Sequence, residues 1–272
     1  MKKKMVFHFY CDYGWKTNPA VKLHLECIKH YSHFLDDVVV VICTDRIEDK
    51  EFINGVKCSV VNAVDCNSLT INVVKNTSLR EAKTFFDEVV NKDYDGVVLF
   101  THTKGYTNFD DDTYNKQCIK EWIVSSYWIN FNFLDEMELS LSYGTKVNNA
   151  LFYGAFLIYS PDGILLEQAA YAGSMFWTNM RNVNHEMFLN GEKVPQLSSR
   201  MSAEQFPGSV CYILKNMLCM THKACAIYSD KCDLYGKIDT RYGPKDTIKL
   251  AFPEDFESYC SFENEIYEKS GV

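Results

Sequence analysis

The sequence predicts an α/β fold with a mainly parallel central sheet flanked by helices. Short apolar, partly β-branched runs at 5–10, 38–43 and 97–100 are typical of buried parallel strands. Segments with helical patterning and capping signals separate these runs along the chain. Ligands of such sheets bind beyond the carboxyl ends of the strands, so the residues that follow each strand are the first candidates for a functional site.

Local signals place the elements of the first half. Asn18 and Pro19 predict a helix start, because a capping side chain precedes a proline in the first turn. Ser78-Leu79-Arg80-Glu81 has the form of a capping box. The predicted order is a strand at 5–10, a helix from Thr17 to Leu35, a strand at 38–43, short apolar stretches within 44–77 (Val60-Val61, Ile71 to Val74) that favour strand over helix, a helix from Ser78 to about Asn91, and a strand at 97–100.

The second half is less regular. Its predicted elements are a long helix from about Tyr114 to Leu141, a strand at 150–159, a turn at 160–163, a short apolar segment at 172–177, helices at 182–189 and 202–219, and a charged tail after Pro253. The sequence contains no repeat, low-complexity segment or clear linker. We therefore expect a single domain over residues 1–272.

Composition narrows the class of partner. The chain is 47% hydrophobic and 14% aromatic, enough for a large core. Its formal charge of −8 makes nucleic acid an unlikely partner, because phosphate binding needs clustered lysine and arginine. Lys2-Lys3-Lys4 precedes no signal-peptide core, and no apolar stretch approaches the ~20 residues of a membrane-spanning helix. The eleven cysteines form no Cys-x-x-Cys pair. We expect a cytoplasmic protein with reduced thiols and no transmembrane segment.

The third strand delivers His102-Thr103-Lys104-Gly105 to its carboxyl end. His102 and Lys104 point the same way if the extended geometry continues. A cation at this position can neutralise a diphosphate leaving group. The alternative interpretation is a solvated exit from the strand.

Two loops offer further candidates. Tyr10, Asp12 and Tyr13 follow the first strand, where a nucleotide base and ribose can stack and hydrogen-bond. The acidic run Asp110-Asp111-Asp112 can hold Mg²⁺ or Mn²⁺ through Asp110 and Asp112, or it can be a solvated loop.

Two later segments carry possible acceptor chemistry. Glu204 lies near a helix start, where it is either a general base for an acceptor hydroxyl or ordinary first-turn helix electrostatics. The segment around Phe176 and Trp177 is either a place where a ring stacks on a sugar or ordinary core packing.

Five motifs follow one another along the chain: His102-Thr103-Lys104-Gly105 with Thr107, Glu121-Trp122, Gly154-Ala155-Phe156, Ala172 to Trp177, and Ala203 to Gly208. The series resembles glycosyltransferases of the rhamnan-synthesis F type and related bacterial and viral "HTKG" glycosyltransferase-like proteins, over about residues 5–210. The resemblance implies a GT-A-like nucleotide-binding sandwich. It also implies a donor-binding half at about 1–110, an acceptor half at 111–225 and a C-terminal extension at 226–272.

The same resemblance implies an inverting glycosyltransferase that moves a sugar from a nucleotide-sugar donor to a glycan acceptor. Its setting would be surface polysaccharide or related glycan synthesis, in a bacterial cell or a virus-infected host cell. In the GT-A pattern the corresponding strand ends in an Asp-x-Asp that binds a divalent metal. Here His102-Thr103-Lys104 takes that place, so either Lys104 supplies the positive charge or the acidic loop binds Mn²⁺ or Mg²⁺.

Site roles follow by the same resemblance. Glu204 is the general base, and Lys104 with His102 stabilises the departing diphosphate. The candidate donor-binding residues are Tyr10, Asp12 and Tyr13, from their place after the first strand, with Thr103 and Gly105; the candidate acceptor-binding residues are Gly173, Ser174, Phe176, Trp177 and Arg200. Two other functions stay open: a degenerate transferase that binds glycan or nucleotide without chemistry, and a phage-type enzyme that glycosylates DNA bases.

Overall fold

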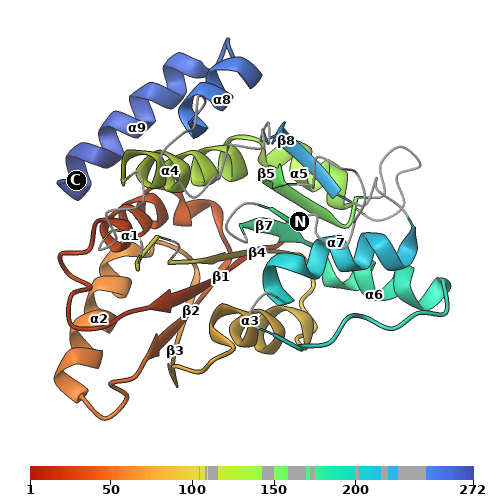
Figure 1. Cartoon of the computed structure of the whole chain (residues 1–272), viewed down its shortest axis with the longest axis horizontal. Helices are drawn as coiled ribbons and strands as arrows, with labels where there is room; N and C mark the ends of the chain where they lie inside the picture. The colour runs from red at the N-terminus through yellow and green to blue at the C-terminus, as the bar shows by residue number, and fades with distance from the viewer. Residues whose placement is uncertain are drawn as a thin grey trace.

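In the part of the chain that the structure describes, eight strands form one sheet. The structure, a computed structural model, describes residues 1–103, 105–107, 109, 116–142, 150–158, 170–171, 175–199, 202–215, 220–225 and 243–272 (Figure 1).

The first four strands are all parallel and lie in the order β3-β2-β1-β4. They are β1 (Lys3–Tyr10), β2 (Asp37–Thr44), β3 (Ser68–Lys75) and β4 (Val97–His102). The four consecutive valines of β2 favour this geometry, because branched Cβ atoms pack well on a pleated surface buried on both faces. The chain passes from β1 to β2 and β3 on one edge of β1, and β4 pairs with the other edge of β1. A topological switch point therefore lies between the carboxyl ends of β1 and β4.

The sheet continues with antiparallel pairings. The added strands are β5 (Phe152–Ile158), β6 (Ala170–Tyr171), β7 (Phe176–Thr178) and β8 (Met220–Cys225). The β7 strand is antiparallel to both β4 and β5 and lies between them, and β8 is parallel to β5. Leu157 is in register with both Tyr171 of β6 and Cys225 of β8. Phe152 is in register with both a β7 residue and a β8 residue. The β6 and β7 strands therefore share one edge of β5, and β8 pairs with the other edge.

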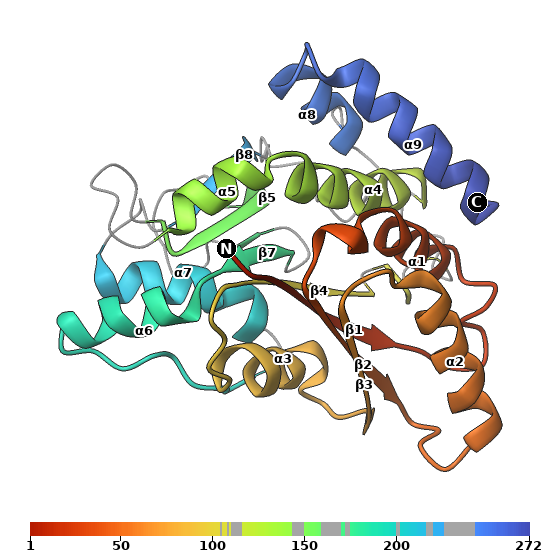
Figure 2. The same cartoon turned by 180° about the vertical axis from the view of Figure 1, so that it is seen from behind.

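Helices cover both faces of the sheet (Figures 1 and 2). One face packs against α1 (Pro19–Tyr31), α2 (Lys50–Ala63), α4 (Lys116–Asn132), α5 (Leu134–Leu141), α8 (Pro244–Ala251) and α9 (Phe256–Ser270). The other face packs against α3 (Arg80–Phe85) with its π-helical continuation over Phe86–Val90, α6 (Met180–Leu189) and α7 (Ser202–Leu214). A short 3₁₀ turn, Ser32–Phe34, follows α1. The α/β class with a mainly parallel, helix-flanked sheet is thus confirmed.

The two cores are formed by opposite faces of the same strands. Phe7 and Phe9 of β1 pack into the α1–α4 side, while Val6 packs into the α3–α7 side. Each side chain of this size contributes about 1.5–3 kcal/mol when it is removed from water. Burial of both faces explains why β1, β2 and β4 are almost continuously apolar.

Several predicted elements need correction. Val60-Val61 belongs to the α2 helix, because Ile53, Val56, Val60 and Ala63 recur at helical spacing and are buried together. The long helix ends at Asn132 and a second begins at Leu134, with Phe133 outside helical geometry between them. The tail after Pro253 is largely the α9 helix, which packs on α1 and α4.

The expected capping box at Ser78 does not form. The residue that precedes α3 is Leu79, and no side chain caps the helix. Arg80 has a left-handed φ of 45°, which breaks the helical geometry at the position where the box would need it.

Candidate functional site

The loops after β1 and β4 meet at the switch point. The Thr103 hydroxyl accepts a hydrogen bond from the Tyr10 backbone N–H at 3.0 Å and donates to the Tyr10 carbonyl at 3.3 Å. The Thr103 backbone N–H donates to the His8 carbonyl at 3.0 Å. Thr103 therefore joins the ends of the two strands, and its own side chain is buried.

Gly105 turns the chain back toward the β1 loop. Its φ is +86°, in the region that favours glycine, and a Cβ there would lie 2.6 Å from the Ile119 side chain. This turn carries Tyr106 into contact with the residues after β1. Glycine is thus required by the backbone of the loop itself.

Tyr106 holds Asp12 in place. The Tyr106 phenol donates a hydrogen bond to Asp12 Oδ1 and accepts one from the Asp12 backbone N–H at 3.3 Å. Asp12 Oδ1 also accepts from the Gly14 N–H at 3.0 Å. Burial, and then the hydrogen bond to Asp12, raise the pKa of Tyr106, so the phenol remains a donor. Among the hydrogen bonds of the described residues, Asp12 Oδ2 has none, so this oxygen keeps its capacity to accept one.

Two tyrosines flank this carboxylate. The Tyr10 ring lies edge-on to Tyr106, with 5.2 Å between centroids. Tyr13 is 65% exposed, and the Arg46 guanidinium lies over its ring. Arg46 is the second residue after β2, and its place just beyond a buried strand is the sequence feature that could have identified it. The structure brings Tyr10 and Asp12 together with Thr103 and Gly105, and it leaves Tyr13 at the outer rim.

His102 lies beside another buried histidine. It is in register with His8 of β1, and the two are 7% and 3% exposed. Burial, and then the neighbouring His102, lower the pKa of His8 to about 3, so His8 is neutral. Its Nδ1 is 2.8 Å from the Thr84 hydroxyl of α3. His8 was visible in the sequence as the one polar residue inside an apolar strand.

Glu204 lies in the first turn of α7 and is 8% exposed. The α7 helix covers the same face of the sheet on which Phe100, two residues before His102, is buried. Phe206 of α7 packs edge-to-face on Phe85 of α3 at 5.1 Å. The predicted placement of Glu204 at a helix start is thus confirmed, whereas its role as a base stays a prediction.

The acceptor role of Phe176 and Trp177 needs correction. Both side chains are 0% exposed because β7 lies between β4 and β5 inside the sheet. Phe176 packs on Phe85 at 5.7 Å, and the Trp177 indole donates to the Asn130 carbonyl at 3.1 Å. With no ring face open to solvent, neither residue can stack on a sugar, and the core-packing interpretation holds.

The remaining predicted site residues lie outside the described residues: Lys104, Asp110, Asp112, Gly173, Ser174 and Arg200. Within the described ranges, no group of three or more histidine, cysteine, aspartate or glutamate side chains is arranged to hold a metal ion. The same ranges contain no helix that is both long enough and apolar enough to cross a membrane.

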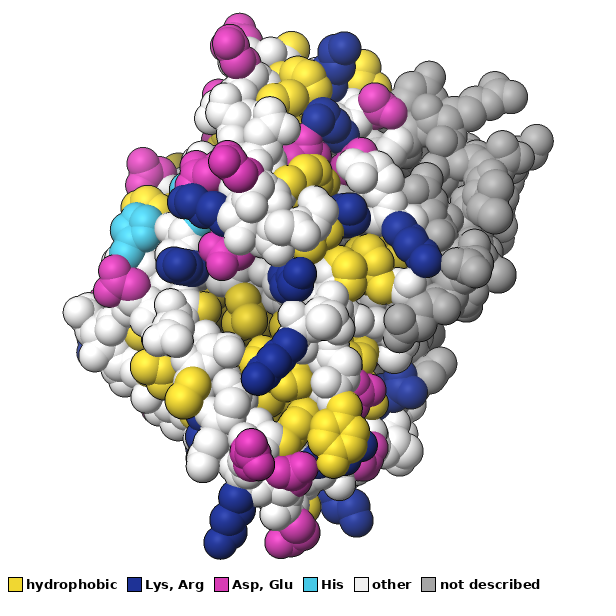
Figure 3. All heavy atoms as spheres, turned by 90° about the vertical axis from the view of Figure 1, so that its left-hand side faces the viewer, with side chains coloured by type: hydrophobic (Ala, Val, Ile, Leu, Met, Phe, Trp, Pro, Cys, Tyr) yellow, Lys and Arg dark blue, Asp and Glu magenta, His cyan; other side chains and the backbone are white. Residues whose placement is uncertain are grey.

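A pocket of about 300 Å³ opens near the carboxyl ends of β2 and β3, beneath α3. It is lined by Val41, Cys43, Asn72, Val73, Val74, Lys75, Thr77, Arg80, Lys83, Thr84, Asp87 and Glu88. The β1 and β2 strands run toward the left-hand side of Figure 1, which Figure 3 shows face-on. Lysine and arginine side chains (dark blue) lie among hydrophobic ones (yellow) across the middle of this side.

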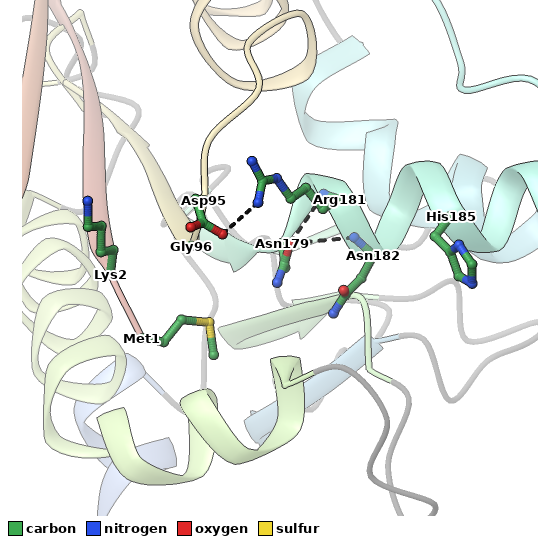
Figure 4. A pocket seen from close by; sticks show the side chains of 8 residues that line it. All are labelled: Met1, Lys2, Asp95, Gly96, Asn179, Arg181, Asn182 and His185. Atoms are coloured by element: carbon green, nitrogen blue, oxygen red, sulfur yellow. Dashed lines mark hydrogen bonds and ion pairs between the residues drawn. The ribbon is translucent and has the colours of Figure 1, made fainter.

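A wider pocket of about 670 Å³ lies at the opposite end of the sheet, by the residues that precede β1 and β4 (Figure 4). Arg181 points to Asp95 there at 2.6 Å, and it also pairs with Asp93 at 2.7 Å. Its charge is therefore already matched by two carboxylates. None of the residues predicted for donor or acceptor binding lines this pocket.

Comparison with known proteins adds little to this geometry. No family model matches the chain, and no curated protein matches it in sequence. Among solved structures, 4-diphosphocytidyl-2C-methyl-D-erythritol synthase from Anaerococcus prevotii is similar at 11% identity and a TM-score of 0.39. The match covers 91% of this chain and 95% of that chain. At this level of similarity, the description of the fold rests on the strand order itself.

Proposed function

We propose that the protein is a nucleotide-sugar-dependent glycosyltransferase that acts on a glycan acceptor. The observation that carries the proposal is Asp12 at the switch point, whose Oδ1 is anchored by Tyr106 while Oδ2 accepts no hydrogen bond from the described residues. A carboxylate oxygen held in this way suits a ribose hydroxyl, and the adjacent Tyr10 ring suits the base. The order of motifs, which resembles that of the rhamnan-synthesis F type enzymes, supports sugar transfer as the reaction.

The proposed chemistry is a single displacement with inversion. The acceptor hydroxyl attacks the anomeric carbon, the bond from that carbon to the diphosphate oxygen breaks, and Glu204 takes the hydroxyl proton. Lys104 and His102 stabilise the negative charge on the departing nucleoside diphosphate. No step of this scheme requires a metal, and bound Mn²⁺ or Mg²⁺ would supply further charge to the diphosphate.

The test is a panel of nucleotide sugars with and without glycan acceptors, in Mn²⁺ or in EDTA, with released nucleoside diphosphate as the readout. Glu204→Gln should lower turnover by at least about a hundredfold while donor binding is retained, because it removes only the base. Asp12→Asn should weaken donor binding by about tenfold or more. Asp37→Asn, at the other end of the sheet, is the matched control and should bind donor normally.

Other outcomes would overturn the proposal. Binding of nucleotide without turnover on any acceptor would indicate a degenerate transferase. Release of pyrophosphate from a nucleoside triphosphate would indicate nucleotidyl transfer instead. Strong, salt-dependent DNA binding would favour the DNA-glycosylating class.

A further inference from the structure

The pocket beneath α3 has an apolar floor and a basic mouth. Val41, Cys43 and Val74 of β2 and β3 line its inner surface. Lys75 and Arg80 line it at the carboxyl end of β3 and the start of α3. A pocket of this size and polarity suits a small ligand with one apolar part and one anionic part.

Its charges are not equivalent. Lys83 is paired with Asp87 at 2.5 Å, four residues along the same helix. Glu88 lies 3.9 Å from Lys92. Lys75 and Arg80 take part in no ion pair among the described residues. The acids of the pocket are therefore neutralised locally, and two positive charges at the mouth have no anionic partner in the described protein.

The pocket adjoins the switch point. Cys43 in its floor is in register with Tyr10, which flanks Asp12. Arg80 lies close enough to both Tyr10 and Cys43 for its charge to act on them, and the charge of Asp45 acts on them in the opposite direction. A ligand held at Asp12 and Tyr10 would thus extend toward the basic mouth of the pocket.

Arg80 is also held in an unfavourable backbone conformation. Its φ of 45° lies in the left-handed region, where a side chain is disfavoured and glycine is not. Such strain is typical of positions where the side chain has a function, since glycine would otherwise fit better.

We propose that Arg80 and Lys75 form an anion site at the mouth of this pocket and bind the phosphate groups of the nucleotide ligand from the β3 side, in addition to Lys104 and His102 after β4. The inference rests on the proposed function for the identity of the ligand, although not for the existence of the site. Guanidinium and ammonium groups donate charge-assisted hydrogen bonds to phosphate oxygens, and the planar guanidinium can do so with two donors at once.

The test compares diphosphates with the matching nucleosides. Calorimetric titration of UDP, GDP, CDP, ADP and dTDP and of their nucleosides identifies the preferred base and measures what the phosphates add. Arg80→Ala should lower the affinity for the preferred diphosphate about tenfold to a hundredfold and leave the nucleoside affinity unchanged. Lys75→Ala should lower the affinity for the diphosphate several-fold by the same reasoning. Lys83→Ala is the matched control, because its charge is committed to Asp87, and it should change the affinity less than about twofold.

A second pair of variants separates binding from folding. Arg80→Gly should melt about 2–4 °C above Arg80→Ala, because glycine relieves the left-handed strain. Both variants should lose equally the part of the diphosphate affinity that the phosphate groups contribute. A stable Arg80→Gly protein with wild-type diphosphate affinity would overturn the proposal.

The failure of this site and of the proposed function are distinguishable. If the wild type binds nucleotide but Arg80→Ala and Lys75→Ala bind it equally well, the anion site is wrong and the donor site stands. If the wild type binds no nucleotide, the proposed function is wrong, and inorganic pyrophosphate becomes the probe. Pyrophosphate binding that disappears in Arg80→Ala would then support the anion site, and no binding to the wild type would overturn it.

Discussion

At the residue scale, the best-defined feature is a phenol that orients a carboxylate. Tyr106 is 5% exposed, and its backbone carbonyl accepts a hydrogen bond from the Asn18 side-chain amide at 2.9 Å. Its hydroxyl then fixes Asp12 in one orientation. A side chain fixed in this way loses little conformational entropy when a ligand binds. Tyr106 is thus a positioning residue, and it acts on a ligand through Asp12.

Removing this hydroxyl should therefore cost binding more than folding. Tyr106→Phe should lower nucleotide affinity about fivefold to thirtyfold, because a charge-assisted hydrogen bond on Asp12 is lost. Tyr94→Phe is the control: its phenol donates to Asp37 at 3.0 Å, at the far end of β2. Both variants should lose a similar stability of about 1 kcal/mol, and only Tyr106→Phe should lose affinity. Equal affinities in titration would contradict a positioning role.

At the element scale, the α1 helix links the sheet to the candidate site through one residue. Asn18 precedes the helix, and its Oδ1 accepts from the backbone N–H groups of Ala20 at 3.0 Å and Val21 at 3.4 Å. Its Nδ2 donates to the Tyr106 carbonyl. Asn18 was predicted as a cap from sequence alone, because capping is decided within one turn. The bond to Tyr106 spans 88 residues and had no local signal.

Two substitutions at Asn18 separate these roles. Asn18→Ala should lower the free energy of unfolding by about 2–3 kcal/mol, since it removes the cap and leaves a buried carbonyl without its donor. Asn18→Asp keeps the capping oxygen and loses only the donor, so it should lie between the wild type and Asn18→Ala. Urea unfolding monitored by circular dichroism measures all three. If Asn18→Asp were as unstable as Asn18→Ala, the cap would contribute nothing.

At the scale of the whole molecule, the centre of the sheet contains two buried histidines side by side. His8 and His102 lie on neighbouring parallel strands at the switch point. Burial, and next His102, hold the pKa of His8 at about 3, below the ordinary value of 6.5, and Glu81 opposes this shift. Between pH 6.5 and 3 the unfolded chain therefore binds a proton on His8 that the folded protein does not.

Acid should consequently destabilise the fold through His8. Its contribution to stability is complete above about pH 6.5 and is lost as the pH falls toward 3, by up to about 1.4 kcal/mol per pH unit. His8→Asn removes the titrating group, so the free energy of unfolding should fall less steeply in this variant from pH 7 to pH 5. Urea unfolding at several pH values compares the two slopes. Parallel slopes for wild type and variant would show that His8 does not carry the acid sensitivity.

The sequence by itself determined the features that depend on short stretches of chain, namely the buried strands, a helix cap and the fold class. The buried strands at 5–10, 38–43 and 97–100 were correctly predicted, because a short apolar or β-branched run is typical of a parallel strand that is buried on both faces. The start of α1 followed from a local cap, and the α/β class followed from the order of these elements. The sequence also placed Asp12 and Thr103 correctly beyond the carboxyl ends of their strands.

Only the tertiary structure decided which of these residues meet and which are buried. Phe176 and Trp177 have the residue types of a sugar platform, but insertion of β7 between β4 and β5 leaves them no exposed surface. The Tyr106–Asp12 contact and the unpaired charge of Arg80 depend on loops that are distant in sequence and adjacent in space. Local propensity does not encode such contacts, because the closure of the whole sheet brings these loops together.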